Sequence, residues 1–139
     1  MSNNFALTKR ITPTQMGINA MAGDESSNEG NWIDARGYNQ VTLFIEFLAS
    51  GDADSGNMTF SIEVSDDAGD TSFFLQSAAV SSGVATLSKL VYTSDTNNAD
   101  HKFAVDFPCN YPHFRITDMA VATGHANDDI TVSAILGKL

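Results

Sequence analysis

Residues 58–65 read Met-Thr-Phe-Ser-Ile-Glu-Val-Ser, with an apolar side chain at every second position. This period of two is typical of a β-strand with one face buried and the other in water. Residues 38–48 alternate in the same way, but Phe44 and Leu48 make their second face partly apolar, as in a strand near the middle of a sheet. The polar loop between the two runs, residues 49–57, is rich in turn-forming residues, so we predict that the runs pair as an antiparallel hairpin.

Further strands are predicted along the rest of the chain, at residues 72–76, 86–92, 101–107, 113–121 and 130–136. The apolar positions change face near Asp118, which predicts a β-bulge or a bend there. Residues 77–83 are interpreted as a loop or a single helical turn, and Trp32 as a side chain of the core. The pattern predicts an all-β protein, an antiparallel two-sheet β-sandwich that is jelly-roll-like, although an immunoglobulin-like sandwich fits as well.

The length of 139 residues fits one domain that buries roughly two-thirds of its unfolded surface. We expect residues 1–31 to form an N-terminal arm or edge segment and residues 32–139 to form the sandwich. The first segment has little periodicity and contains the polar loop 23–30. It is interpreted either as a less ordered arm that becomes ordered on a neighbour, or as an edge strand with a fraying terminus.

The formal net charge is −10, from 7 Lys and Arg residues against 17 Asp and Glu residues. This balance disfavours nucleic acid and anionic membranes as partners and favours a partner with a basic patch. Cys109 is the only cysteine, so an intramolecular disulfide is excluded and a buried, inert thiol is expected. Without a signal peptide or an apolar run of about 20 residues, the chain is expected to be made in the cytoplasm and to stay out of membranes.

No catalytic motif, phosphate-binding glycine loop or dinucleotide fingerprint is present, so we expect a protein that is not an enzyme and needs no cofactor. Two acidic loops are the weak candidates for a metal site, here for Ca²⁺, although Asp is also a common residue of solvated turns. Their carboxylates are Asp52, Asp54, Asp66, Asp67 and Asp70. The histidines His101, His113 and His125 do not have the spacing of a zinc site.

Aromatic side chains are the candidates for a carbohydrate platform, since sugar rings stack on them. They are Trp32, Tyr38, Tyr92 and Tyr111. Most other aromatic residues are phenylalanines at positions expected to be buried, which is typical of a core.

Residues 32–45, the loop with Gly51 and Gly56, and the run Phe60-Ser-Ile-Glu-Val-Ser-Asp-Asp-Ala-Gly69 carry a resemblance. This part of the chain resembles small β-sandwich virion proteins of tailed bacteriophages, in which a "Gly-Tyr-x-x-Val-Thr" strand is followed by a hairpin that ends in "Glu-x-Ser-Asp-Asp". The resemblance implies a capsid decoration (cement) protein or another minor structural component of the virion. It implies no catalytic residues.

This role would place the protein on the capsid surface, with the major capsid protein as partner and with self-association, for example as a trimer. We expect Phe5, Leu7 and Ile11 to provide the partner or oligomer contact from the N-terminal segment. A tail- or fibre-associated module that binds a receptor or carbohydrate is the alternative. A calcium-dependent binding domain unrelated to phages is a third hypothesis.

Overall fold

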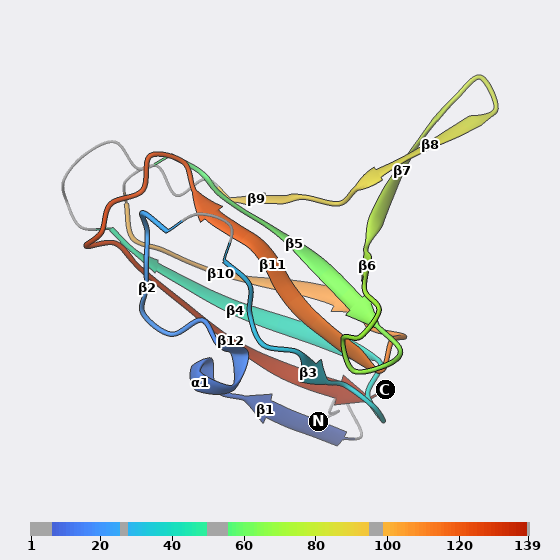
Figure 1. The fold of residues 1–139 in the computed structure, drawn as a ribbon, viewed down its shortest axis with the longest axis horizontal. Helices are drawn as coiled ribbons and strands as arrows, with labels where there is room; N and C mark the ends of the chain where they lie inside the picture. Colours follow the sequence, from blue (N-terminus) through green and yellow to red (C-terminus); the bar gives the residue numbers. More distant parts are fainter. Residues whose placement is uncertain (1–6, 26–27, 50–55, 95–98, 139) are drawn as a thin grey trace, which may run out of the picture.

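The computed structural model describes residues 7–25, 28–49, 56–94 and 99–138. Two sheets lie face to face, and every strand pairing in these residues is antiparallel (Figure 1). The predicted all-β, two-sheet sandwich is therefore confirmed.

The first sheet has the strand order β1-β12-β4-β10, and the short strand β2 also pairs with β12. Its strands are β1 (Leu7–Ile11), β2 (Met21–Ala22), β4 (Gln40–Leu48), β10 (His101–Pro108) and β12 (Asp129–Lys138). Strand β4 has neighbours on both sides, as its partly apolar second face predicted.

The second sheet has the order β3-β11-β5-β6, and β9 pairs with β5 as well. Its strands are β3 (Ile33–Asp34), β5 (Met58–Ser65), β6 (Phe73–Phe74), β9 (Tyr92–Ser94) and β11 (His113–Val121). The register of β11 against β5 shifts between Thr117 and Ala120, and Asp118 has a φ of 53°. This confirms the predicted bulge near Asp118.

The core lies between the two sheets and is built from the apolar positions of the alternating strands. The fully buried side chains include Leu43, Ile45 and Phe47 from β4, Phe60 and Ile62 from β5, Phe114 and Ile116 from β11, and Ile130, Val132 and Leu136 from β12. The period of two thus buries the apolar face of each main strand, as expected. On β5 the polar face is buried as well, at Ser61, Glu63 and Ser65, so the prediction that this face lies in water is wrong.

The predicted hairpin of residues 38–65 is wrong, because β4 and β5 lie in different sheets. Strand β4 pairs with β12 and β10, whereas β5 pairs with β11, β6 and β9. Both strands bury an apolar face in the same core, so alternation predicts which face points inward. It does not predict which strand lies beside which.

Residues 7–22 are part of the sandwich, so the expectation of a less ordered arm, which was made for residues 1–31, is wrong for this part of the segment. Strand β1 is an edge strand on β12. The helical turn α1 (Pro13–Met16) begins at a Thr12 capping box and ends at Gly17, whose φ is 77°. It brings Met16 into the core, and Ile18 follows it there. The edge-strand alternative therefore describes Leu7–Ile11.

A third pair of strands, β7 (Gln76–Ser81) and β8 (Val84–Lys89), belongs to neither sheet. It forms a two-stranded hairpin that projects from the body of the sandwich (Figure 1). The interpretation of residues 77–83 as a loop or helical turn is therefore wrong. Below, "the hairpin" means residues 76–89.

Candidate interaction surface

Every residue of the hairpin is exposed, including its larger apolar side chains. Val80 is 73% and Leu87 65% exposed. The strands join through Ser82 and Gly83, whose φ angles of 50° and 76° are both positive. Two positive φ angles in a two-residue loop are those of a type I′ turn, whose twist matches a β-hairpin. The hairpin is therefore well formed locally but has no covering layer among the described residues.

The two faces of the hairpin differ in chemistry. The pairs Ala78–Leu87 and Val80–Ala85 lie on one face, and we call these four residues the apolar face. The opposite face consists of the pairs Ser77–Ser88, Ala79–Thr86 and Ser81–Val84, and the hydroxyl oxygens of Ser77 and Ser88 are 3.1 Å apart. The hairpin is thus an amphipathic ribbon that presents apolar side chains to solvent.

The hairpin carries no charge before Lys89, although the chain is strongly acidic. Residues 71–88 contain no Asp, Glu, Lys, Arg or His. Six of the ten large apolar residues exposed in the described part of the chain fall within residues 73–91: Phe73, Phe74, Val80, Val84, Leu87 and Val91. Clustered exposed apolar surface of this kind is typical of a protein–protein contact.

Strand β5 holds the base of the hairpin. Strands β6 and β9 pair with the same strand β5, and the chain leaves the sheet between them. At this point Leu75 N–H donates to the Ile62 carbonyl at 3.1 Å, and Leu90 N–H donates to the Leu75 carbonyl at 2.9 Å. These backbone bonds fix where the hairpin starts.

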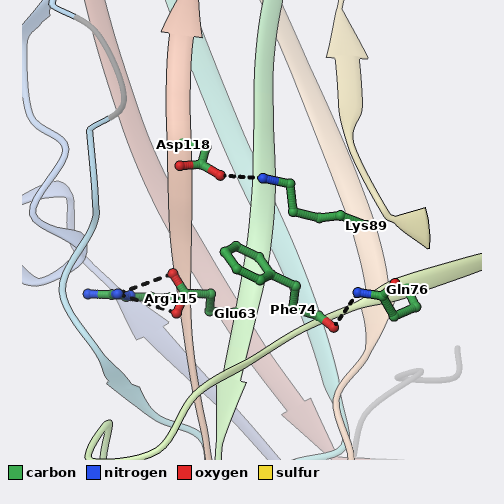
Figure 2. Close-up of polar contacts among 6 residues, drawn as sticks. All are labelled: Glu63, Phe74, Gln76, Lys89, Arg115 and Asp118. Carbon is green, nitrogen blue, oxygen red and sulfur yellow. Dashed lines mark hydrogen bonds and ion pairs between the residues drawn. The ribbon is translucent and has the colours of Figure 1, made fainter. Parts of the chain in front are cut away.

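A polar contact links the hairpin to β11. Figure 2 shows Lys89 reaching toward Asp118, with its Nζ 2.7 Å from Asp118 Oδ2. The same ammonium group lies 4.6 Å from the centre of the Phe74 ring. Bulges commonly redirect a side chain, and here the bulge places the Asp118 carboxylate within reach of Lys89. The bulge thus helps to set the direction of the hairpin.

A second ion-pair group lies on the same outer face of the second sheet. Arg115 Nη2 is 3.1 Å and 3.3 Å from the carboxylate oxygens of Glu63 (Figure 2). Its Nη1 is 3.1 Å from Glu29, and its guanidinium is 4.7 Å from the centre of the Trp32 ring. Trp32 is therefore half-buried against Arg115 outside the core, so its interpretation as a core side chain is wrong.

An open hollow of about 470 Å³ adjoins the base of the hairpin. Its lining includes Val64, Phe73, Phe74, Leu75 and Tyr111. Phe73 is 58% exposed. The hollow extends the exposed apolar surface from the hairpin onto the body.

The predicted N-terminal contact residues do not form one exposed surface. Phe5 lies outside the described residues. Leu7 is exposed at the start of the edge strand, whereas Ile11 is only 3% exposed and belongs to the core. Ile11 therefore stabilises the sandwich itself.

The acidic loops are placed as follows. Asp52 and Asp54 lie outside the described residues. In the turn after β5, the Asp67 carboxylate accepts hydrogen bonds from the Thr71 N–H and the Ser65 hydroxyl, each at 2.7 Å. These bonds lower the pKa of Asp67 and hold the turn in place. The described residues contain no group of three or more His, Cys, Asp or Glu that could hold a metal ion. Asp66 and Asp70 are therefore not part of such a group.

The candidate aromatic platform is divided among several places. Tyr38 and Tyr111 line one open hollow of about 330 Å³. Tyr92 instead stacks on Phe60, with ring centres 4.9 Å apart, and burial raises its pKa. Together with the position of Trp32, this leaves two of the four rings sharing a surface.

Cys109 is fully buried and unbonded to another cysteine. Burial raises the pKa of its thiol, and its Sγ lies 3.5 Å from the Tyr111 carbonyl oxygen. These features agree with the expected inert thiol.

None of the helices in the described residues is long and apolar enough to cross a membrane.

The comparisons with known proteins give similarity to solved structures but not to characterised sequences. The sequence matches no protein-family model and no curated protein. Among solved structures, the SPBc2 prophage-derived protein YomS is similar over 97% of this chain and 98% of its own, with 13% sequence identity and a TM-score of 0.46.

Proposed function

We propose that this chain is a non-enzymatic virion structural protein that binds the outside of a phage capsid and stabilises it. The observation that carries the proposal is the exposed hairpin, which has an apolar face and no charged residue before Lys89. The resemblance of residues 32–69 to small phage virion proteins provides the biological setting. The major capsid protein is the proposed partner, and neither a cofactor nor a nucleic acid takes part.

The hairpin is suited to contact because it gains stability when it is covered. An isolated two-stranded hairpin is at best marginally stable in water. Covering one Val or Leu side chain contributes roughly 1.5–3 kcal/mol. A protein that contributes several such contacts at each repeated site of a shell links neighbouring shell subunits and raises the cost of separating them.

Charge favours a particular surface on the capsid. With a net charge of −10, the body of the sandwich is attracted to a basic patch and repelled by an acidic one. We therefore expect the electrostatic part of the attachment to weaken as ionic strength rises, because salt screens charges but not the apolar contact of the hairpin.

The test is to count this polypeptide in purified particles of the phage that encodes it. Quantitative mass spectrometry gives its ratio to the major capsid protein. Hundreds of copies per particle are expected for a decoration protein, and particles that lack it should release DNA at a lower temperature. A few copies per particle would support the tail or fibre alternative, and absence from particles would overturn a virion role.

A further inference from the structure

We propose that the apolar face of the hairpin packs against the same face of a second copy of this chain, in a two-fold symmetric, antiparallel arrangement. The occupant of the exposed face is then another hairpin, with its tip toward the partner's body. This inference concerns the purified protein in solution and so goes beyond the proposed attachment to a capsid. The second copy covers the face in solution, and the capsid would replace it on a particle.

Charge limits which surfaces two copies can bring together. Each chain carries a formal charge of −10, so like charges oppose contact over most of the surface. The outer face of the first sheet carries Glu46, Lys102 and Asp106. The apolar face lies within an uncharged stretch, residues 71–88, so its four residues can pack against a second copy without burying a charge. Lys89, at the base of the same side of the hairpin, is already paired with Asp118.

The apolar face is complementary to itself. Each cross-strand pair joins a small side chain to a larger one, Ala78 to Leu87 and Val80 to Ala85, and the larger residue changes strand from one pair to the next. When two such faces stack about a two-fold axis across the strands, Val80 lies over the partner's Ala78 and Leu87 over the partner's Ala85. Large side chains then meet small ones at all four positions, which permits close packing.

The antiparallel arrangement also accounts for the hollow at the base. If the hairpins stacked in parallel, with both tips at the same end, the two acidic bodies would be side by side. In the antiparallel arrangement the bodies lie at opposite ends, and each tip reaches the partner's exposed Phe73 and Phe74. A six-residue strand spans about 20 Å, so one hairpin is long enough to reach from its own base to its partner's.

The expected contact is small. A standard interface buries roughly 800 Å² per partner, and one hairpin face with its base patch lies at or below that value. We therefore expect a reversible dimer with a Kd on the order of micromolar.

The experiment is sedimentation equilibrium of the purified full-length chain over a range of concentrations. Three proteins are compared: the wild type, the apolar-face variant Val80→Glu/Leu87→Glu, and the matched control Ala79→Glu/Thr86→Glu. Both variants add two carboxylates to the same strands, but on opposite faces. The wild type and the control should form dimers, whereas the apolar-face variant should raise the Kd by at least about 100-fold.

A second measurement separates loss of contact from loss of hairpin structure. A further variant, Val80→Lys/Leu87→Lys, is mixed with Val80→Glu/Leu87→Glu. If the same faces meet, each variant alone is a monomer and the mixture forms a heterodimer that weakens with salt. Failure of the mixture to associate would overturn the pairing.

Three other results would overturn the pairing as well. The first is a wild type that stays monomeric at a protein concentration of about 100 µM, which is 100-fold above the expected Kd. The others are a dimer that survives Val80→Glu/Leu87→Glu, and a trimer. These outcomes are distinct from those for the virion role. Absence from particles would leave a solution dimer intact, and a monomer in solution would leave the copy number per particle unchanged.

Discussion

The ion pair of Glu63 and Arg115 predicts a large loss of stability for Arg115→Leu. The Glu63 side chain is only 5% exposed, and Arg115 donates to both of its carboxylate oxygens. Leucine removes these donors and leaves a buried carboxylate without its cation. Removing one partner of a buried ion pair costs about 3–5 kcal/mol, a large part of the 5–15 kcal/mol that typically stabilises a domain.

The assay is urea unfolding followed by circular dichroism, with the free energy of unfolding extrapolated to water. The double variant Glu63→Met/Arg115→Leu should recover most of the loss, because replacing both charges by apolar groups leaves none unpaired. Glu29→Gln is the control, since Glu29 is the exposed partner of Arg115 and should contribute at most about 1 kcal/mol. A loss below about 1 kcal/mol for Arg115→Leu, or a double variant no better than the single one, would refute the reasoning.

Three further predictions concern single sites. Gly69→Ala should lower the free energy of unfolding by about 1–3 kcal/mol, because φ at Gly69 is +99° and a Cβ would collide with the Trp32 indole. Urea unfolding measures this loss, and an unchanged midpoint would contradict the prediction. Burial raises the pKa of the Cys109 thiol, so the thiol should stay protonated and unreactive toward a disulfide reagent at pH 8 until the chain is unfolded. Because this pKa is higher in the folded chain than in the unfolded chain, the free energy of unfolding should decline as pH rises above the ordinary thiol pKa of 9.0. Fast labelling of the native protein would argue against this. Asp118→Asn weakens a half-exposed contact to Lys89, so it should change the free energy of unfolding by less than about 1 kcal/mol. It should still increase the fast motion of the hairpin measured by ¹⁵N relaxation. Unchanged relaxation would show that Lys89 does not orient the hairpin.

The sequence predicts the sandwich well because the alternation of apolar and polar residues indicates which face of each strand is buried. Met58, Phe60, Ile62 and Val64 are all buried on one face of β5, as their spacing indicates. The bulge near Asp118 was also predictable, because an extra residue reverses which positions are apolar. Strand partners were not predictable, because β4 and β5 show similar patterns whichever sheet they join.

The hairpin was missed for a different physical reason. Its residues are small, so their alternation is weak, and the pattern cannot distinguish a strand inside a sheet from one that projects into solvent. The Ser82-Gly83 pair is a two-residue turn signal that would have predicted a hairpin here. Trp32 was misplaced similarly, because stacking against Arg115 depends on a residue more than eighty positions away.

Protection of the exposed strands gives an independent reason to expect that the hairpin is covered. Proteins commonly place charged residues or proline on exposed strands to prevent unwanted pairing. The two edge strands of the first sheet follow this rule, with Lys9 and Arg10 on β1 and Lys102 and Pro108 on β10. The hairpin has no charged residue before Lys89, although it is more exposed than either edge. A chain that protects both edges of its first sheet, but leaves its most exposed strands apolar and uncharged before Lys89, is best explained if a partner covers those strands.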